Sequence, residues 1–489
     1  MDGEKKSRII SSLIWKFCER IGVQGIQFVI QICLARLLTP DDYGMLALVL
    51  VFINIAAVFV QGGFGSALIQ KNKVDEKDMT SAFFICFAMA CLFYSILFIL
   101  APGIALFYHQ ERLSLYLRTA GVILFPGAYN AIQNAYIQRN LLFRQLFKVS
   151  LNTIVISGAV GIILAASGLG TWALIFQQIV YNVVICIFLM KIVPWKPRLC
   201  FSREKAGGLF RFGSRLLLAS LLNSIYRNLR NLVVGRNFSA ETLGYLNRAE
   251  QLPGLIVNNV DGAMQSVLFP VYSSEQENKS VLKDLMRKSV KMSSFVLFPM
   301  MIGLIAVSKE CILILFGAAW LPCVPLMRII CLEFVLYPIH TANLQAINSV
   351  GRSDIYLKLE VLKKIFGIMI LFGSIQYGIY GIVTGSVLIS IGSAFMNAYP
   401  NQTILNYSYV QQIRDILPGF CIAAVMGVTV HMVSYIEMNL FFMLIIKIIT
   451  GIVVYAGLAL IFRTDEMKFF KQLLFHVYNR HKKRKYEGL

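Results

Sequence analysis

Apolar runs long enough to cross a lipid bilayer recur along the whole chain of 489 residues, and they limit its fold more than any other feature. About 20 consecutive apolar residues span the hydrocarbon core of a membrane as a helix. Hydrophobic residues make up 57% of the sequence and charged residues only 15%, whereas soluble globular proteins carry about 25% charge. We therefore predict an all-α polytopic membrane protein with about fourteen transmembrane helices. They are expected at 12–38, 43–66, 81–101, 113–137, 149–167, 171–193, 209–237, 244–270, 289–308, 320–348, 359–377, 379–399, 416–435 and 439–462.

The basic residues are concentrated in alternate connections between these helices, although a net charge of +21 could by itself suggest a nucleic-acid partner. Cytoplasmic loops of membrane proteins carry an excess of Lys and Arg. The distribution therefore predicts a multi-pass membrane protein with both termini in the cytoplasm and no nucleic-acid partner. Two basic residues, Arg112 and Lys309, fall instead in connections that are predicted to be external.

The first predicted helix carries a polar stripe along one face. From Lys16 the steps to the next polar residues are four, four, three and four, which is helical spacing. These residues are Arg20, Gln24, Gln27 and Gln31. Two hundred residues later the positions that correspond to them are Ser220, Ser224, Arg227 and Asn231. The segment LARLLTPDDYG (34–44) likewise matches VGRNFSAETLG (234–244), so we predict an internal repeat in which each copy begins with a polar membrane helix.

The repeat predicts two six-helix lobes in parallel orientation, related by an axis along the membrane normal. Helices 13 and 14 have no counterpart and are interpreted as a lipid-facing addition. The predicted domains are an N-terminal lobe at 1–200, a C-terminal lobe at 201–402, the additional helices at 403–463 and a basic cytoplasmic tail at 464–489. The tail is amphipathic and rich in Lys and Arg, so it is expected to lie on the inner leaflet, with membrane lipids as partners.

Many basic side chains fall inside predicted helices. An Arg that faces lipid at mid-bilayer costs at least about 2.5–3.5 kcal/mol, so such residues should line water, pair with acids or extend to the interface. The main intramembrane acids are Glu19, Glu250, Asp261 and Glu333, which leaves an excess of positive charge. A water-filled cavity of that sign would suit an anion. The intramembrane basic residues are Lys16, Arg20, Arg36, Arg118, Arg211, Arg215, Arg227, Arg230, Arg236, Arg248, Arg328 and Lys447.

The candidate substrate-binding residues combine cations with amides that can bind sugars. Arg215 could instead extend to the cytoplasmic interface, and Arg118 and Arg248 could lie at the outer interface rather than in the cavity. Glu19 is either the partner of Arg20 or an ion-coupling group, and Asp261 is the other candidate for ion coupling. No cofactor is expected, and the coupling ion would be H⁺ or Na⁺. The substrate-binding candidates are Arg20, Gln24, Gln27, Gln31, Arg118, Arg215, Asn223, Arg227, Arg230, Asn231 and Arg248.

A family resemblance begins in the same residues. The opening WKFCERIGVQGIQFVIQICLARLLTPDDYGMLAL, followed by QGGFGSALIQ, resembles the Wzx-type flippases. These form the polysaccharide transport family of the multidrug/oligosaccharidyl-lipid/polysaccharide exporter superfamily, and the similarity is greatest to exporters of colanic and teichuronic acid. The resemblance implies a V-shaped cavity between two six-helix lobes, alternating access and a polyprenyl-diphosphate-linked oligosaccharide as cargo. It also implies that helices 13 and 14 hold the lipid tail and that arginines hold the diphosphate; we match Arg20, Arg227, Arg230 and Arg248 to that role.

The predicted function is therefore a flippase that moves a lipid-linked oligosaccharide to the outer leaflet of the bacterial plasma membrane for cell-surface polysaccharide synthesis. Polysaccharide polymerase machinery is its expected partner. One alternative is a multidrug antiporter on the same fold, although its cationic substrates would favour acidic cavities. A membrane polysaccharide polymerase is a second alternative. An enzyme of that kind should offer a sizeable external loop or a convergent His/Asp/Glu group, and the sequence favours neither, so we predict that the chain is not an enzyme.

Overall fold

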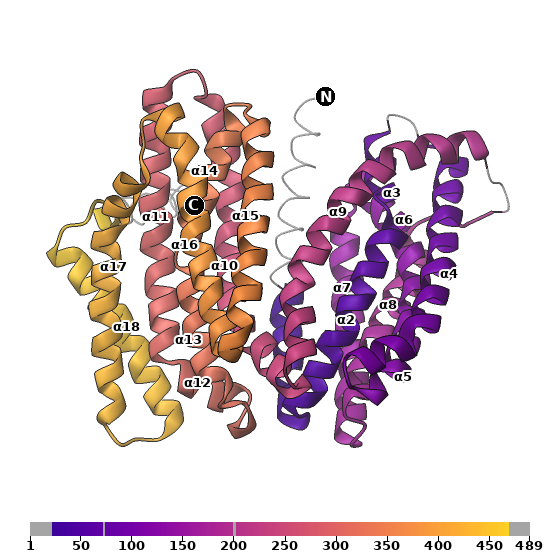
Figure 1. Cartoon of the computed structure of the whole chain (residues 1–489), viewed down its shortest axis with the longest axis horizontal. Coiled ribbons are helices and arrows are strands. Elements are labelled where there is room, and N and C mark those ends of the chain that lie inside the picture. Colours follow the sequence, from indigo (N-terminus) through magenta and orange to yellow (C-terminus); the bar gives the residue numbers. More distant parts are fainter. Residues whose placement is uncertain (1–21, 72–73, 199–201, 469–489) are drawn as a thin grey trace, which may run out of the picture. The chain divides into compact units, whose positions relative to one another are not determined.

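The computed structural model describes residues 22–71, 74–198 and 202–468 (Figure 1), and every regular element in these ranges is a helix. Nine helical stretches in the described ranges are long and apolar enough to cross a membrane. The all-α polytopic fold is thereby confirmed. The count of about fourteen spans and the parallel repeat stay predictions. The basic tail from residue 469 onward lies outside the described residues.

The chain forms two compact units, Met1–Gly244 and Tyr245–Leu489. The domain boundaries predicted at 200, 402 and 463 stay predictions. The N-terminal unit contains the helix Gly22–Leu37, α2 (Pro40–Gln61), α3 (Phe64–Gln70), α4 (Glu76–Phe107), α5 (Glu111–Ala120), α6 (Leu124–Arg139), α7 (Phe143–Ala166), α8 (Thr171–Ile192) and α9 (Arg203–Asn237).

The C-terminal unit contains nearly all of α10 and the helices after it. Within this unit, α17 and α18 lie on one flank beside α11 (Figure 1). The helices are α10 (Ala240–Ser274), α11 (Lys279–Ala306), α12 (Ser308–Leu315), α13 (Cys323–Phe334), α14 (Tyr337–Ser349), α15 (Ser353–Ser374), α16 (Gly378–Leu405), α17 (Tyr409–Met432) and α18 (Leu440–Ile461).

Several helices that were predicted as continuous are broken. The helix expected at 113–137 is divided by a 3₁₀ turn, Gly121–Ile123, into α5 and α6. The helix expected at 320–348 is divided into α13 and α14, and Pro338 lies in the first turn of α14, where its missing N–H costs nothing. Runs of apolar residues therefore locate the helices but not the breaks within them.

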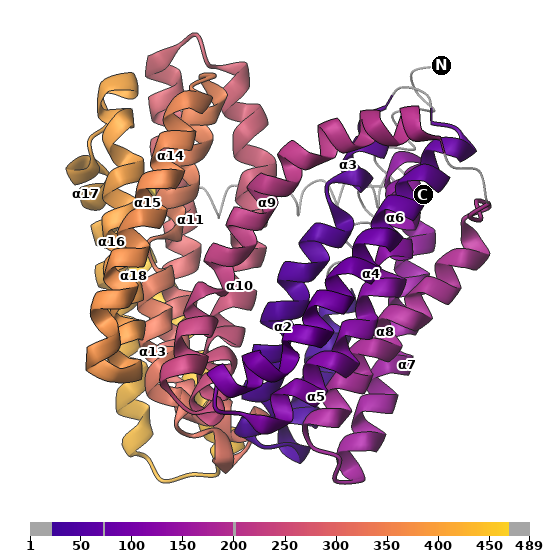
Figure 2. The ribbon, with the colours of Figure 1, turned by 45° about the vertical axis from the view of Figure 1, so that its right-hand side comes forward.

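The turn between α2 and α3 needs glycine. Gly62 and Gly63 have φ values of 52° and 72°, a left-handed conformation that glycine adopts without a steric penalty. The backbone there also approaches α9, because a Cβ added at Gly213 would lie 2.8 Å from the Gly62 carbonyl oxygen. Figure 2 shows α9 passing along α3 and then α2, with which it is in contact. The glycines thus allow α9 to pack closely on α2 and α3.

The core of the N-terminal unit is built around small residues on α4. Ala82, Cys86 and Ala90 are fully buried and follow one another at four-residue spacing, so they form one face of the helix. Small side chains on such a face let neighbouring membrane helices approach closely. Aromatic residues are also part of this core; the centres of the stacked Tyr129 and Trp195 rings, for example, lie 5.5 Å apart.

Candidate substrate-binding face

The polar stripe of the first helix covers only part of its length. Gln27 is exposed, and Gln24 and Gln31 are half-buried. Leu34 lies seven residues after Gln27 and so nearly on the same face, but it is 1% exposed and packs in an apolar cluster with Leu174. The polar face thus gives way to a buried apolar face halfway along the helix. Glu19 and Arg20 lie outside the described residues.

The helix α9 changes in the same way. Arg227 is exposed and Asn231 half-buried, whereas Val234, seven residues after Arg227, is completely buried. Leu34 and Val234 occupy corresponding positions at the offset of 200 residues in the sequence, and both are buried. In each of these helices the polar face thus ends before the segment that packs into the apolar core of the N-terminal unit.

The polar side chains on these faces differ in what they contact. Arg227 forms no hydrogen bond or ion pair with the residues that the structure describes, and it is exposed. The amide of Asn228, by contrast, donates to the Ser224 carbonyl of its own helix at 2.8 Å. Arg227 is thus available to a ligand, while its neighbour is satisfied within the helix. Candidates with interaction partners of their own are Gln24, Gln31, Asn223, Arg230 and Asn231.

Two of the arginines that were predicted to bind substrate contact aromatic rings. Arg118 on α5 donates to the Phe98 carbonyl at 3.2 Å, and its guanidinium lies 4.3 Å from the centre of the Phe98 ring. Arg248 on α10 is 3% exposed and lies 4.9 Å and 5.2 Å from the ring centres of Phe316 and Trp320. Stacking on aromatic faces stabilises a buried guanidinium. The protein itself therefore supplies partners for both arginines.

Asp261, the second candidate for ion coupling, is held by hydrogen bonds. Its carboxylate accepts from Gln265 at 2.7 Å and from the Thr341 hydroxyl, so it joins α10 to α14. The side chain is only half-buried. Of the remaining candidates, the backbone of Arg215 belongs to α9, and its side chain lies outside what the structure describes.

The helices α9 and α10 are unusual in their polarity. Each has 35 residues, which corresponds to about 52 Å at 1.5 Å per residue and exceeds the thickness of a bilayer. Yet neither is among the nine stretches that are apolar enough to span a membrane in the described chain. Helices of this length that cannot face lipid all round must present a polar side to water, to protein or to a polar ligand.

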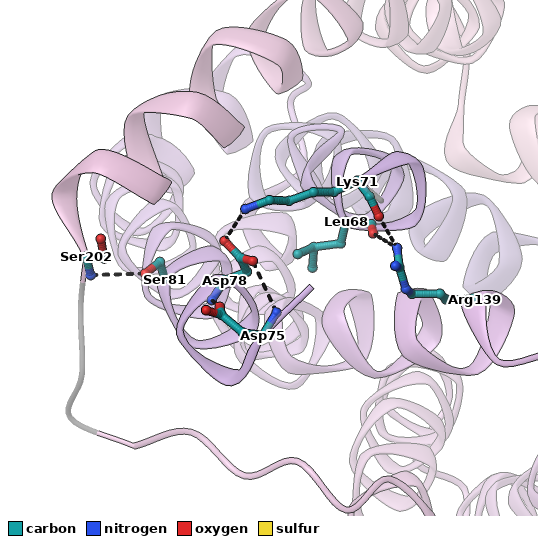
Figure 3. Close-up of polar contacts among 7 residues, drawn as sticks. All are labelled: Leu68, Lys71, Asp75, Asp78, Ser81, Arg139 and Ser202. Carbon is teal, nitrogen blue, oxygen red and sulfur yellow. Dashed lines mark hydrogen bonds and ion pairs between the residues drawn. The ribbon is translucent and has the colours of Figure 1, made fainter. Parts of the chain in front are cut away.

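A separate polar network joins the end of α3, the start of α4 and the end of α6 in the N-terminal unit (Figure 3). Lys71 donates to Asp78 at 2.6 Å, and Asp78 also accepts from the Asp75 N–H at 3.2 Å. Arg139, at the end of α6, donates to the carbonyls of Leu68 at 3.0 Å and of Lys71, where α3 ends. A cation at a helix C-terminus satisfies carbonyls that have no partner within the helix. Lys71 and Arg139 thus hold the ends of neighbouring helices together.

A separate hydrogen bond nearby anchors the start of α9. The Ser202 N–H donates to the Ser81 hydroxyl of α4 at 3.1 Å, just before α9 begins (Figure 3). Asp78 is 1% exposed and Ser81 is fully buried. Buried polar groups of this kind are stable only when they are hydrogen-bonded. The bond between Ser202 and Ser81 therefore fixes the start of α9 against α4.

The C-terminal unit contains buried polar groups that the sequence did not reveal. Lys447 on α18 is 1% exposed and donates to Glu310 of α12 at 2.5 Å. Glu310 was missing from the expected intramembrane acids because it follows the predicted helix end at 308. The signal was present, since a Lys in an apolar run requires a nearby anion. The excess positive charge is therefore smaller than predicted.

Buried amides join three helices of the same unit. Asn343 of α14 donates to Gln412 of α17 at 2.7 Å and accepts from Asn401 of α16 at 2.8 Å. All three side chains are fully buried. In sequence they look like the candidate sugar ligands, so only the structure distinguishes a packing amide from an exposed one.

Comparison with known proteins defines the class. A family model described as "Polysaccharide biosynthesis protein" matches residues 33–325, and the chain belongs to this family. It is 23% identical over 437 residues to the teichuronic acid biosynthesis protein TuaB of Bacillus subtilis (strain 168), covering 87% of this chain and 89% of that one. It is 22% identical to the lipopolysaccharide biosynthesis protein WzxC of Escherichia coli (strain K12), covering 86% and 88% of the two chains. The predicted family is confirmed.

Solved structures show the same fold. The structure resembles the lipid II flippase MurJ with a TM-score of 0.73 at 16% identity, covering 93% of this chain and 98% of that one. It also resembles a multidrug resistance MATE family transporter with a TM-score of 0.57 at 16% identity, covering 78% and 96%. The chain therefore shares the fold of these two proteins.

Proposed function

We propose that this protein is a flippase that moves a polyprenyl-diphosphate-linked oligosaccharide from the cytoplasmic to the outer leaflet by alternating access. The observation that carries the proposal is that α9 is long enough to cross a membrane but too polar to face lipid, and that it exposes Arg227. Membership of a polysaccharide biosynthesis family supplies the class of cargo. TuaB and WzxC, which match most of the chain, are both named for the synthesis of cell-surface polymers.

The chemistry of the exposed face suits a diphosphate with sugars attached. A guanidinium binds phosphate oxygens through paired, charge-assisted hydrogen bonds, and we assign this role to Arg227 and its neighbour Arg230. Amides such as Gln27 and Asn223 both donate and accept, as sugar hydroxyls require. The polyprenyl tail would stay in the lipid while the head group crosses. Arg118 and Arg248 are left out of this assignment because aromatic rings of the protein already hold them.

A multidrug antiporter is the second candidate because its fold is shared. The sign of the exposed charge separates the two functions. A cationic drug would be repelled by Arg227 and attracted by carboxylates, whereas a diphosphate would be attracted. A polymerase would be an enzyme, and transporters that match the whole fold support transport instead. We place both termini in the cytoplasm, as the loop charges predict, and we expect polysaccharide polymerase machinery to take the cargo.

We assign ion coupling to Asp261. It connects α10 with α14 through Thr341, so protonation or Na⁺ binding at this carboxylate would change a contact between two helices. The energy source would then be an H⁺ or Na⁺ gradient. A gradient that leaves transport unchanged in reconstituted vesicles would remove this assignment without affecting the flippase proposal.

The experiment is leaflet exchange in proteoliposomes that contain the full-length chain. A fluorescently labelled polyprenyl-diphosphate oligosaccharide is added, and dithionite, which cannot cross the membrane, bleaches the label in the outer leaflet. We expect the protein to make the inner pool accessible, while a neutral polyprenyl glycoside is exchanged no faster than in protein-free vesicles. Exchange of a cationic dye without exchange of the diphosphate lipid would favour the multidrug antiporter.

A further inference from the structure

A pocket of about 370 Å³ lies at one end of the N-terminal unit, where α2, α5 and α8 meet. These helices are in mutual contact and share that end in Figure 1. Its walls come from the first turn of α2, the start of α5 and the turn between α7 and α8. The turns at this end contain no Lys or Arg apart from Arg112, so the loop charges predict that it faces outward. A volume of this size can hold a polar ligand head group.

The polar wall of the pocket is fixed in position. The Thr171 hydroxyl donates to Asp42 Oδ1 at 2.9 Å, and Asp42 Oδ2 accepts from the Thr39 N–H at 3.0 Å and its hydroxyl at 2.7 Å. Gly170 has a φ of 54°, and a Cβ there would lie 2.8 Å from Asp42 Oδ1. The turn before α8 is thereby held against the N-terminus of α2, and the Asp42 carboxylate is fixed in position beside the pocket.

The aromatic wall is equally well packed. The rings of Tyr116 and Trp172 meet edge to face at 4.9 Å. Tyr116 is buried, while Trp172 remains half-exposed toward the pocket that it lines. Tryptophan is enriched at the level of lipid head groups because its ring is both apolar and able to donate a hydrogen bond.

Arg112 supplies a cation at this pocket. It is exposed, and it forms no hydrogen bond or ion pair with the part of the chain that the structure describes. Its charge acts on Asp41, but the guanidinium donors stay available. Arg112 is also an exception to the expected excess of cations on the inner face. A planar guanidinium with open donors suits a phosphodiester, which it can hold through two parallel hydrogen bonds.

The rim of the pocket is apolar. Leu115 and Leu169 line it and are 57% and 42% exposed. A saccharide would place hydroxyl groups against these leucines, whereas a phospholipid would place its acyl chains there. The combination of an open guanidinium, a fixed carboxylate and an apolar rim therefore favours a lipid that is anchored by its head group.

We propose that this pocket binds an outer-leaflet glycerophospholipid, with its phosphodiester on Arg112 and the hydroxyl or ammonium end of its head group near Asp42. The bound lipid would bridge α5 to the contact between α2 and α8. This site is distinct from the face of α9 and does not depend on the flippase proposal.

Native mass spectrometry of the delipidated full-length chain tests the proposal. Phosphatidylglycerol, phosphatidylethanolamine or phosphatidylcholine is added at equal concentration, and the retained lipid is counted. We expect the wild type to retain one phosphatidylglycerol or phosphatidylethanolamine molecule, with phosphatidylcholine weaker because its bulky ammonium has no hydrogen to donate to Asp42. Arg112→Ala should reduce retention about tenfold, the effect of losing a charge-assisted contact.

The matched control is Lys309→Ala, which removes the other exposed cation that is predicted to lie on the outer side. It should leave retention unchanged. Arg112 forms no hydrogen bond or ion pair with the described residues, so Arg112→Ala is expected to fold, and an unchanged melting temperature without lipid checks this. Equal retention by both variants would overturn the proposal, as would retention of a carbohydrate-bearing lipid but none of the three phospholipids.

Discussion

The charged residues of α9 and those of the C-terminal unit solve the same problem in opposite ways. On α9, Arg227 is exposed and forms no hydrogen bond or ion pair within the described chain. In the C-terminal unit, Lys447 is paired with Glu310 at 2.5 Å, and Arg248 is buried against two aromatic rings. A charge in a membrane protein is expensive unless it reaches water or a partner. The difference shows which charges hold the fold and which are available to a cargo.

The buried ion pair should give the largest effect on stability. Replacing Lys447 by Met leaves Glu310 buried without its cation, which typically costs about 3–5 kcal/mol. We expect a large drop in the melting temperature of the purified protein and early protease cleavage near α18. The double variant Lys447→Met/Glu310→Gln should recover part of the loss because no unpaired charge remains. If Lys447→Met melts like the wild type, this pair does not anchor α18.

The amide network should give the next effect. Asn343→Leu removes partners from Gln412 and Asn401, both fully buried. Leaving buried polar groups unsatisfied costs about 1–3 kcal/mol each. The melting temperature should fall, and less than for Lys447→Met. Asn182→Leu is the control, since that amide donates only to the Gln178 carbonyl of its own helix at 2.9 Å. Equal falls in melting temperature for both variants would mean that the amide network contributes no more to stability than a single amide that bonds within its own helix.

Sequence reasoning predicted the fold class and the family but separated these charges poorly. Apolar runs locate helices because hydrocarbon requires about 20 such residues, whatever their order. Lys447 and Arg227 are both cations within predicted membrane helices, so the sequence alone does not separate them. Their fates depend on long-range contacts: Lys447 meets Glu310, which is 137 residues away. Helical periodicity describes one helix at a time and cannot supply such partners.

The candidate site was predictable only in part. Gln27 and Arg227 were found from their spacing along a helix face; both are exposed, and their role in substrate binding stays a prediction. The same spacing could not show that the face becomes buried at Leu34 and Val234. Nor could it show that Arg118 contacts Phe98, which lies on another helix, α4. It also missed the break at Gly121–Ile123 in the helix that was expected as one piece. Residue spacing predicts which side chains share a helix face, whereas packing against other helices decides whether that face is exposed or buried.

Arg248 should give an intermediate effect that sharpens the comparison. Arg248→Lys keeps the charge but replaces a planar group that stacks on Phe316 and Trp320. Such contacts contribute about 2 kcal/mol or more when they are desolvated, and the Lys ammonium keeps part of this attraction. We expect a modest fall in melting temperature and unchanged transport of the labelled lipid per folded molecule. Transport that is lost while stability is kept would instead place Arg248 in the substrate site.

Arg227 should have the smallest effect on stability and a large one on function. Because its side chain is exposed, Arg227→Gln should change the free energy of unfolding by no more than about 0.5 kcal/mol. Loss of a charge-assisted contact to the diphosphate should slow leaflet exchange about tenfold to a hundredfold. Arg227→Lys should fall between, because Lys keeps the charge but cannot form the paired hydrogen bonds. Asn228→Ala, one residue along on a different face, should exchange the lipid at the wild-type rate. A variant Arg227→Gln that is stable and fully active would show that an open guanidinium on α9 does not mark the cargo, and the contrast with Lys447 would then concern folding alone.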